Sequence, residues 1–147
     1  MTEQQTQSVK EEKKALREVL RQRSEESAEN VQEASQGLAD IFMSSSDFLD
    51  ARAAGTLLIS AYSGYGSEID PLPLIKELSA QGHKFCLPCE IEKGQPLKFR
   101  AYDLGDPVQI GEYGIPEPLG SAPIVSPDIM LIPMLGFDRT GNRLGRG

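Results

Sequence analysis

Residues 56–61 read Thr-Leu-Leu-Ile-Ser-Ala, a short and almost entirely apolar run. Runs of this kind are typical of strands buried on both faces of a sheet. A helix is expected next, between Asp70-Pro71 and Gly82. Further strands are expected at 85–88, 97–102 and 129–133, the last two separated by a Gly- and Pro-rich loop over 103–127. This alternation predicts an α/β fold with an open, mainly parallel sheet covered by helices on both faces, in three layers.

Upstream of that run, the pattern is helical. Apolar residues recur at helical spacing over 10–23 and again over roughly 29–49, with a possible interruption at Ser44–Asp47. Residues 1–9 are polar and are expected to be disordered. The sequence therefore predicts an N-terminal helical segment attached to one α/β domain that spans residues 1–147.

Composition and charge limit the classes of function. With 39% apolar and 25% charged residues, the chain has the balance of a soluble globular protein. The net charge of −7 is uneven: the body is acidic, whereas residues 10–23 and 139–146 are basic. An acidic body disfavours nucleic acid as a partner, because that affinity depends on neutralising phosphates. The two basic ends either converge on one compact anion or are simply solvated faces.

Targeting signals are not evident in the sequence. The apolar runs all fall short of the 18 or so residues that a membrane helix needs, so no membrane partner is expected. The polar, partly acidic start argues against a signal or transit peptide. A cytoplasmic monomer is the expected form.

Two loops follow predicted strands, and both carry groups that suit ligands. The carboxyl ends of parallel strands share one edge of a sheet, where α/β proteins bind ligands. The first loop, Tyr62–Glu68, ends in a carboxylate that either caps the next helix or accepts a ring N–H from a heterocycle. The second, Gly141–Gly147, combines glycines with Arg143 and Arg146, which suits phosphate, although a surface turn is the alternative. Its spacing matches neither the dinucleotide fingerprint nor the P-loop.

Three further patterns are weaker. Cys86 and Cys89 have the spacing of a redox pair, but they fall on a predicted strand instead of a helix N-terminus. His83 with these cysteines gives three zinc ligands, and only Glu90 or Glu92 is left as a fourth. No metal site is therefore predicted on these residues. His83 itself is expected to be an exposed turn residue.

Five ordered segments resemble the 5-formyltetrahydrofolate cyclo-ligase family, also called methenyltetrahydrofolate synthetase. They are Lys13-Lys14-Ala15-Leu16-Arg17, Tyr62–Glu68 with Asp70, Leu74–Pro88, Gly114-Ile115-Pro116-Glu117-Pro118, and Asp128–Gly147. The last segment is the most specific, because Phe137-Asp138 followed by Gly141-Asn142-Arg143-Leu144-Gly145-Arg146-Gly147 looks like the nucleotide loop of that family.

The resemblance implies a reaction and its ligands. The family closes the ring of 5-formyltetrahydrofolate to 5,10-methenyltetrahydrofolate, using ATP and Mg²⁺ and releasing ADP and phosphate. The small-molecule substrate is a reduced folate, which places Ser63, Glu68, Arg146 and Gly147 at the substrate, with Arg146 as the catalytic residue. ATP is expected at Lys13, Lys14, Ala15, Leu16 and Arg17 and at Arg143, Leu144, Gly145, Arg146 and Gly147.

One departure from the family pattern affects what is expected. In the family the loop continues into Gly-Tyr-Tyr-Asp, which includes a metal-associated Asp, whereas this sequence stops at Gly147. The domain is therefore expected to be incomplete at its C-terminal side, and the activity of these residues alone is doubtful. The alternative function is a non-catalytic binding module of the same fold. A sugar-phosphate isomerase or acyl-carrier transferase would also want a basic phosphate site, but would not explain both basic segments.

Overall fold

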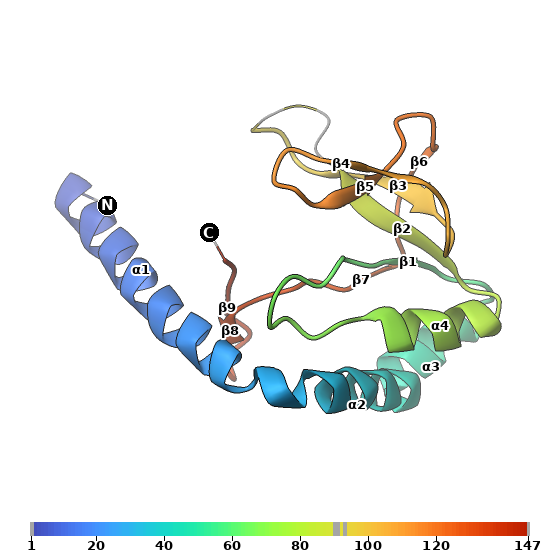
Figure 1. Ribbon diagram of the computed structural model, residues 1–147, viewed down its shortest axis with the longest axis horizontal. Coiled ribbons are helices and arrows are strands. Elements are labelled where there is room, and N and C mark those ends of the chain that lie inside the picture. The colour runs from blue at the N-terminus through green and yellow to red at the C-terminus, as the bar shows by residue number, and fades with distance from the viewer. Residues whose placement is uncertain (1, 90–91, 93, 147) are drawn as a thin grey trace.

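The computed structural model describes residues 2–89, 92 and 94–146 (Figure 1). Its helical elements are α1 (Glu3–Glu26), the short 3₁₀ helix η1 (Ala28–Asn30), α2 (Val31–Ser44), α3 (Ser46–Arg52) and α4 (Leu72–Ala80). Its strands are β1 (Leu58–Ser60), β2 (Lys84–Cys89), β3 (Lys98–Tyr102), β4 (Val108–Ile110), β5 (Pro116–Pro118), β6 (Ile124–Val125), β7 (Ile129–Met130), β8 (Gly136–Phe137) and β9 (Arg143–Leu144).

The main sheet has five strands in the order β6-β3-β2-β1-β7. β1 pairs in parallel with β2 and β7, whereas β3 pairs antiparallel with β2 and β6. The predicted α/β class is confirmed, but the sheet is mixed instead of mainly parallel. The reason lies between Cys89 and Lys98, because that connection is too short for the crossover that a parallel neighbour needs.

The helices α2, α3 and α4 lie together on one face of the sheet (Figure 1). Their buried side chains join those of β1 and β2 in a single core, which includes Phe48, Ile59, Leu74, Leu78 and Phe85. The hairpin of β4 and β5 was not predicted, because its residues lie within the segment assigned to a loop. Within the described residues, the helices that pack on the sheet cover one of its faces (Figure 1). The prediction had helices on both faces, in three layers.

The N-terminal helical segment is confirmed, and it begins earlier than predicted. Glu3 to Val9, which we expected to be disordered, form the first turns of α1, while Met1 lies outside the described residues. Thr2 and Gln5 form a capping box, in which each side chain bonds the backbone N–H of the other. The second half of α1 lies beside β8 and β9 (Figure 1), and a Cβ added to Gly136 would come within 2.7 Å of Leu20.

The predicted interruption of the second helix is present at Ser45, which separates α2 from α3. The Ser45 hydroxyl accepts from the backbone N–H of Phe48, so it caps α3 and helps to place the most buried aromatic ring of the core. α4 ends at Ala80, and Gly82 just beyond its cap has a φ of +85°, a conformation that favours glycine. None of the described helices is both long and apolar enough to cross a membrane.

His83 is buried, which corrects the expectation of an exposed turn residue. Its side chain is 8% exposed, and Nδ1 accepts a hydrogen bond of 3.0 Å from the backbone N–H of Leu57. The ring also stands edge-on to Phe48. The imidazole therefore satisfies the backbone at the start of β1, in the core instead of in solvent.

Candidate functional site

A cavity of about 530 Å³ lies at the carboxyl ends of the three parallel strands β1, β2 and β7. This is the edge where the topology predicts a ligand site. Most lining side chains are apolar, and the charged groups come from two loops: Glu68 from one, which also brings Ser63, and Arg143 and Arg146 from the other. We call residues 62–68 the tyrosine loop and residues 138–146 the arginine loop.

The tyrosine loop is shaped by its own backbone contacts. The N–H of Glu68 donates to the carbonyl of Tyr65 at 3.2 Å, and Gly66 between them has a φ of +60° that suits glycine. The Glu68 carboxylate turns back and accepts from the N–H of Tyr65 through Oε2 at 2.9 Å. The carboxylate is therefore oriented, and its other oxygen stays available to a second donor.

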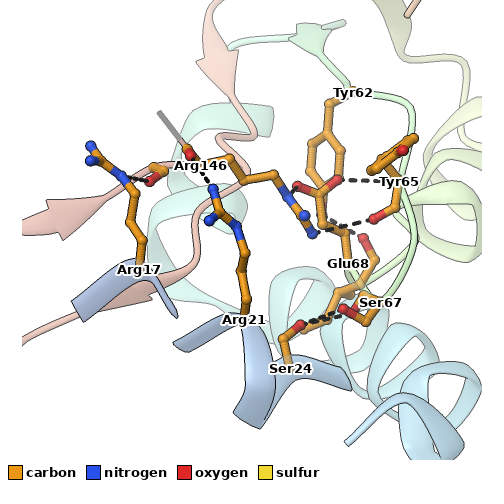
Figure 2. Close-up of polar contacts among 10 residues, drawn as sticks. Arg17, Arg21, Ser24, Tyr62, Tyr65, Ser67, Glu68 and Arg146 are labelled. Atoms are coloured by element: carbon orange, nitrogen blue, oxygen red, sulfur yellow. Dashed lines mark hydrogen bonds and ion pairs between the residues drawn. The ribbon is translucent and has the colours of Figure 1, made fainter. Parts of the chain in front are cut away.

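That second donor is Arg146. Its Nε donates to Glu68 Oε1 at 2.7 Å, and its guanidinium also reaches the Tyr65 carbonyl and lies 5.8 Å from the centre of the Tyr65 ring (Figure 2). The Glu68 side chain is 11% exposed and that of Arg146 is 32% exposed. The pair joins the two loops across 78 residues of sequence and is partly shielded from water.

The arginine loop is held by Asp138. Its Oδ1 accepts from the backbone N–H groups of Thr140 and Asn142 and from the Thr140 hydroxyl, and its Oδ2 accepts from the Asn142 amide. The side-chain hydrogen bond from Asn142, with the other donors, lowers the pKa of Asp138 well below its ordinary value. The carboxylate therefore stays charged and closes the turn between β8 and β9.

α1 contacts the same loop through two arginines on one face. Arg17 Nε donates to the carbonyl of Gly145 at 3.0 Å, and Arg21 donates to the carbonyl of Arg146 at 2.8 Å (Figure 2). The Ser24 hydroxyl lies 2.6 Å from that of Ser67 in the tyrosine loop. α1 thus holds both loops. Sequence reasoning missed Arg21, although its position four residues after Arg17 places it on the same helix face.

The structure brings together some of the predicted site residues and leaves others apart. Arg17, Ser63, Glu68, Arg143, Gly145 and Arg146 lie around the cavity or the contact between the two loops. Leu144 forms part of β9. Lys13, Lys14, Ala15 and Leu16 are exposed on α1, and within the described part of the chain none of their side chains forms a hydrogen bond or ion pair with the arginine loop. Gly147 lies outside the described residues.

Tyr62 lines the cavity and lies near the charged carboxylate of Glu68. Its hydroxyl donates to the carbonyl of Ile69 at 2.7 Å. Burial, followed by the nearby charges of Glu68 and Asp70, raises the pKa of Tyr62 to about 12. The phenol therefore remains neutral at physiological pH and acts as a donor.

The residues considered for redox or metal chemistry serve the core instead. Cys86 and Cys89 are both free thiols buried in β2, and burial raises the pKa of Cys86 to about 11. A raised thiol pKa disfavours the thiolate that redox chemistry and metal binding need. Over residues 2–89, 92 and 94–146, no group of three His, Cys, Asp or Glu side chains is arranged to hold a metal ion. Glu90, one of the possible fourth zinc ligands, lies outside these ranges.

An apolar cavity at the end of a parallel sheet, with a carboxylate and a guanidinium at its edge, defines a small-molecule site of an α/β protein. The model of the 5-formyltetrahydrofolate cyclo-ligase family matches residues 9–147. The chain belongs to this family, as the sequence resemblance predicted.

Two similar proteins give the extent of the likeness. A 5-formyltetrahydrofolate cyclo-ligase from Mycolicibacterium smegmatis is 34% identical over 97 residues, which cover 60% of this chain and 50% of that protein. The NMR structure of 5,10-methenyltetrahydrofolate synthetase from Aquifex aeolicus superimposes with a TM-score of 0.65 at 22% identity, over 90% of this chain and 68% of that one. The fold is therefore shared, and the chain spans about half the length of the curated relative that it matches.

Proposed function

We propose that this site serves the ATP-dependent closure of 5-formyltetrahydrofolate to 5,10-methenyltetrahydrofolate, with release of ADP and phosphate. One observation carries the proposal: Glu68 and Arg146 meet beside an apolar cavity. A reduced folate offers a flat ring with N–H donors, which suits apolar walls and an oriented carboxylate. Phosphoryl transfer needs a cation with paired donors, which suits arginine.

In the proposed reaction the formyl oxygen attacks the γ-phosphorus of ATP, and the bond to the bridging oxygen of ADP breaks. N10 of the folate then attacks the activated formyl carbon, the C–O bond to phosphate breaks, and N10 loses its proton to solvent. The protein's part is to position the two reactants and neutralise charge. We assign Glu68 and Ser63 to the folate, and Arg146 to the transferred phosphoryl group.

For the nucleotide we propose the segment Lys13–Arg17 of α1 together with Arg143–Gly147. The support is the approach of Arg17 to the arginine loop. Within the described residues, the side chains of Lys13 and Lys14 are exposed on α1. They would contact only a phosphate chain that extends out of the cavity. The described residues offer no cluster for Mg²⁺, so we assign the ion to the nucleotide's phosphate oxygens and no catalytic step to it.

The test uses the chain with 5-formyltetrahydrofolate, ATP and Mg²⁺. Formation of the methenyl product is followed by its absorbance, and ADP is measured in parallel, with one ADP expected for each product. Removing a preorganised donor to developing charge costs about 100- to 1000-fold in rate. Arg146→Gln is therefore expected to lower the measured rate by at least about 100-fold. Arg139→Gln is the matched control, because Arg139 is exposed in the same loop.

The second candidate is a binding module of the same fold that lacks catalysis. It is favoured by the ion pair between Glu68 and Arg146, in which each of these two groups already has a partner within the chain. Calorimetric binding of 5-formyltetrahydrofolate without any product would select this candidate. Absence of both binding and product would contradict the two together.

A further inference from the structure

The Glu68–Arg146 pair stands between two cavities. One is the cavity at the strand ends, and a second, of about 660 Å³, lies toward α1 and the start of α2. Five residues line both cavities: Tyr62, Glu68, Ile132, Pro133 and Arg146. The Glu68–Arg146 contact therefore forms part of the wall that the two cavities share.

The pair also occupies one edge of the Arg146 guanidinium and one acceptor position on the Glu68 carboxylate, groups that ligands would use. Arg146 gives Nε and one terminal nitrogen to Glu68 and to the Tyr65 carbonyl. A phosphate needs two neighbouring N–H groups of a guanidinium for a bidentate contact. Glu68 in turn accepts from Arg146 through one oxygen and from the Tyr65 N–H through the other, so a ligand N–H meets a carboxylate whose two oxygens each already accept a hydrogen bond.

Separating the pair is costly unless each partner finds a replacement. Glu68 is 11% exposed, and a mostly buried carboxylate left without its cation loses much stabilisation. An N–H donor from a heterocycle compensates Glu68, and phosphate oxygens compensate Arg146. Each ligand therefore favours the separated arrangement and lowers the cost that the other has to meet.

We infer that the Glu68–Arg146 pair is a switch that keeps the site closed without ligands and couples the two ligands positively when they bind. The inference rests on the proposed function, since it takes the folate as the ligand of Glu68 and a phosphate chain as the ligand of Arg146. A reduced folate that takes Glu68 frees Arg146, and the phosphate chain then binds more tightly. By linkage, the phosphate chain tightens folate binding by the same factor.

The first experiment measures the switch without folate. Inorganic tripolyphosphate is titrated by calorimetry into the wild-type chain, Glu68→Gln and Glu33→Gln. Glu68→Gln weakens the hold on Arg146, so we expect it to bind tripolyphosphate about five-fold more tightly than the wild type. Glu33→Gln makes the same change of charge at an exposed site on α2 and is expected to match the wild type. Equal or weaker binding by Glu68→Gln, or no binding by either chain, would overturn the inference.

The second experiment needs no variant and so does not depend on how Glu68→Gln folds. Saturating 5-formyltetrahydrofolate is expected to tighten tripolyphosphate binding to the wild-type chain about five-fold, with the same factor in the reverse order of addition. In Glu68→Gln the folate should have no such effect. Independent binding of both ligands to the wild type would overturn the switch and leave the proposed function standing. A chain that binds tripolyphosphate but not the folate would refute the proposed function and the coupling. The first experiment would still show whether Glu68 restrains phosphate binding by Arg146.

Discussion

Tyr62 shows how one neutral side chain can depend on the charges beside it. Its pKa is raised to about 12 by burial and by Glu68 and Asp70, while an unfolded chain ionises its tyrosines near pH 10. Between these values the folded state keeps a proton that the unfolded state has lost. The stabilisation from Tyr62 is therefore complete below about pH 10 and is lost as the pH rises toward 12.

We therefore expect the free energy of unfolding to fall across pH 10 to 12, and to fall less steeply in Tyr62→Phe. The measurement is urea unfolding at a series of pH values, followed by circular dichroism. Tyr113→Phe is the matched control, because that ring is 71% exposed. Parallel curves for the wild type and Tyr62→Phe would show that Tyr62 does not contribute to the alkaline slope.

For several single residues, the sequence did not predict the partners that they contact in the structure. Glu68 and Arg146 were predicted at a ligand site from loop position and family resemblance, yet nothing in the sequence indicated that they pair with each other. Their contact depends on how α1 places the arginine loop. His83 was misplaced for a similar reason, because its acceptor role depends on the N–H of Leu57, a residue 26 positions away.

At the scale of elements, α1 is joined to the arginine loop by close packing as well as by its arginines. A Cβ at Gly136 would lie 2.7 Å from Leu20 Cδ1, so a larger side chain at position 136 forces Leu20 to move and disturbs the packing between α1 and β8. Gly136→Val is expected to weaken tripolyphosphate binding about three-fold or more, because the loop then shifts relative to Arg17 and Arg21. Calorimetry gives this factor directly.

Leu20→Ala in the same chain provides the control. Shortening this side chain makes room for the added methyl groups, so the double variant should recover most of the lost affinity, and the two changes should not be additive. Additive losses in Gly136→Val with Leu20→Ala would mean that position 136 acts on the loop by another route.

The elements differed in how well the sequence predicted them. The strand at 56–61 and its neighbours were expected because both faces are buried, which leaves continuous apolar runs. β4, β5 and β6 were missed, since they are only two or three residues long, β4 is exposed throughout, and β5 contains two prolines. The early start of α1 does have a signal in the sequence, because Thr2 and Gln5 have the spacing of a capping box.

At the scale of the whole molecule, stability rests on one core between the sheet and α2, α3 and α4. Phe48 is the most buried aromatic side chain within it, at 1% exposed. Phe48→Ala is expected to lower the free energy of unfolding by about 3–5 kcal/mol, through lost burial and the cavity left behind.

Urea unfolding provides the measurement for this variant. Ile41→Ala on α2 is the control, since Ile41 is 71% exposed, and it should change the free energy of unfolding by no more than about 0.5 kcal/mol. A loss below about 1 kcal/mol for Phe48→Ala would show that the core can close around the missing ring.

The carbonyl of Gly145, which accepts from Arg17, has a consequence for what lies on the other side of the same peptide plane. In a trans peptide the C=O and the following N–H point in opposite directions. Fixing this oxygen toward α1 therefore aims the amide hydrogen of Arg146 away from the helix. A residue of α1 can in this way set the direction of a peptide dipole that faces a ligand, without touching the ligand. Substitutions on that helix can therefore alter anion preference although no residue at the binding surface has been changed.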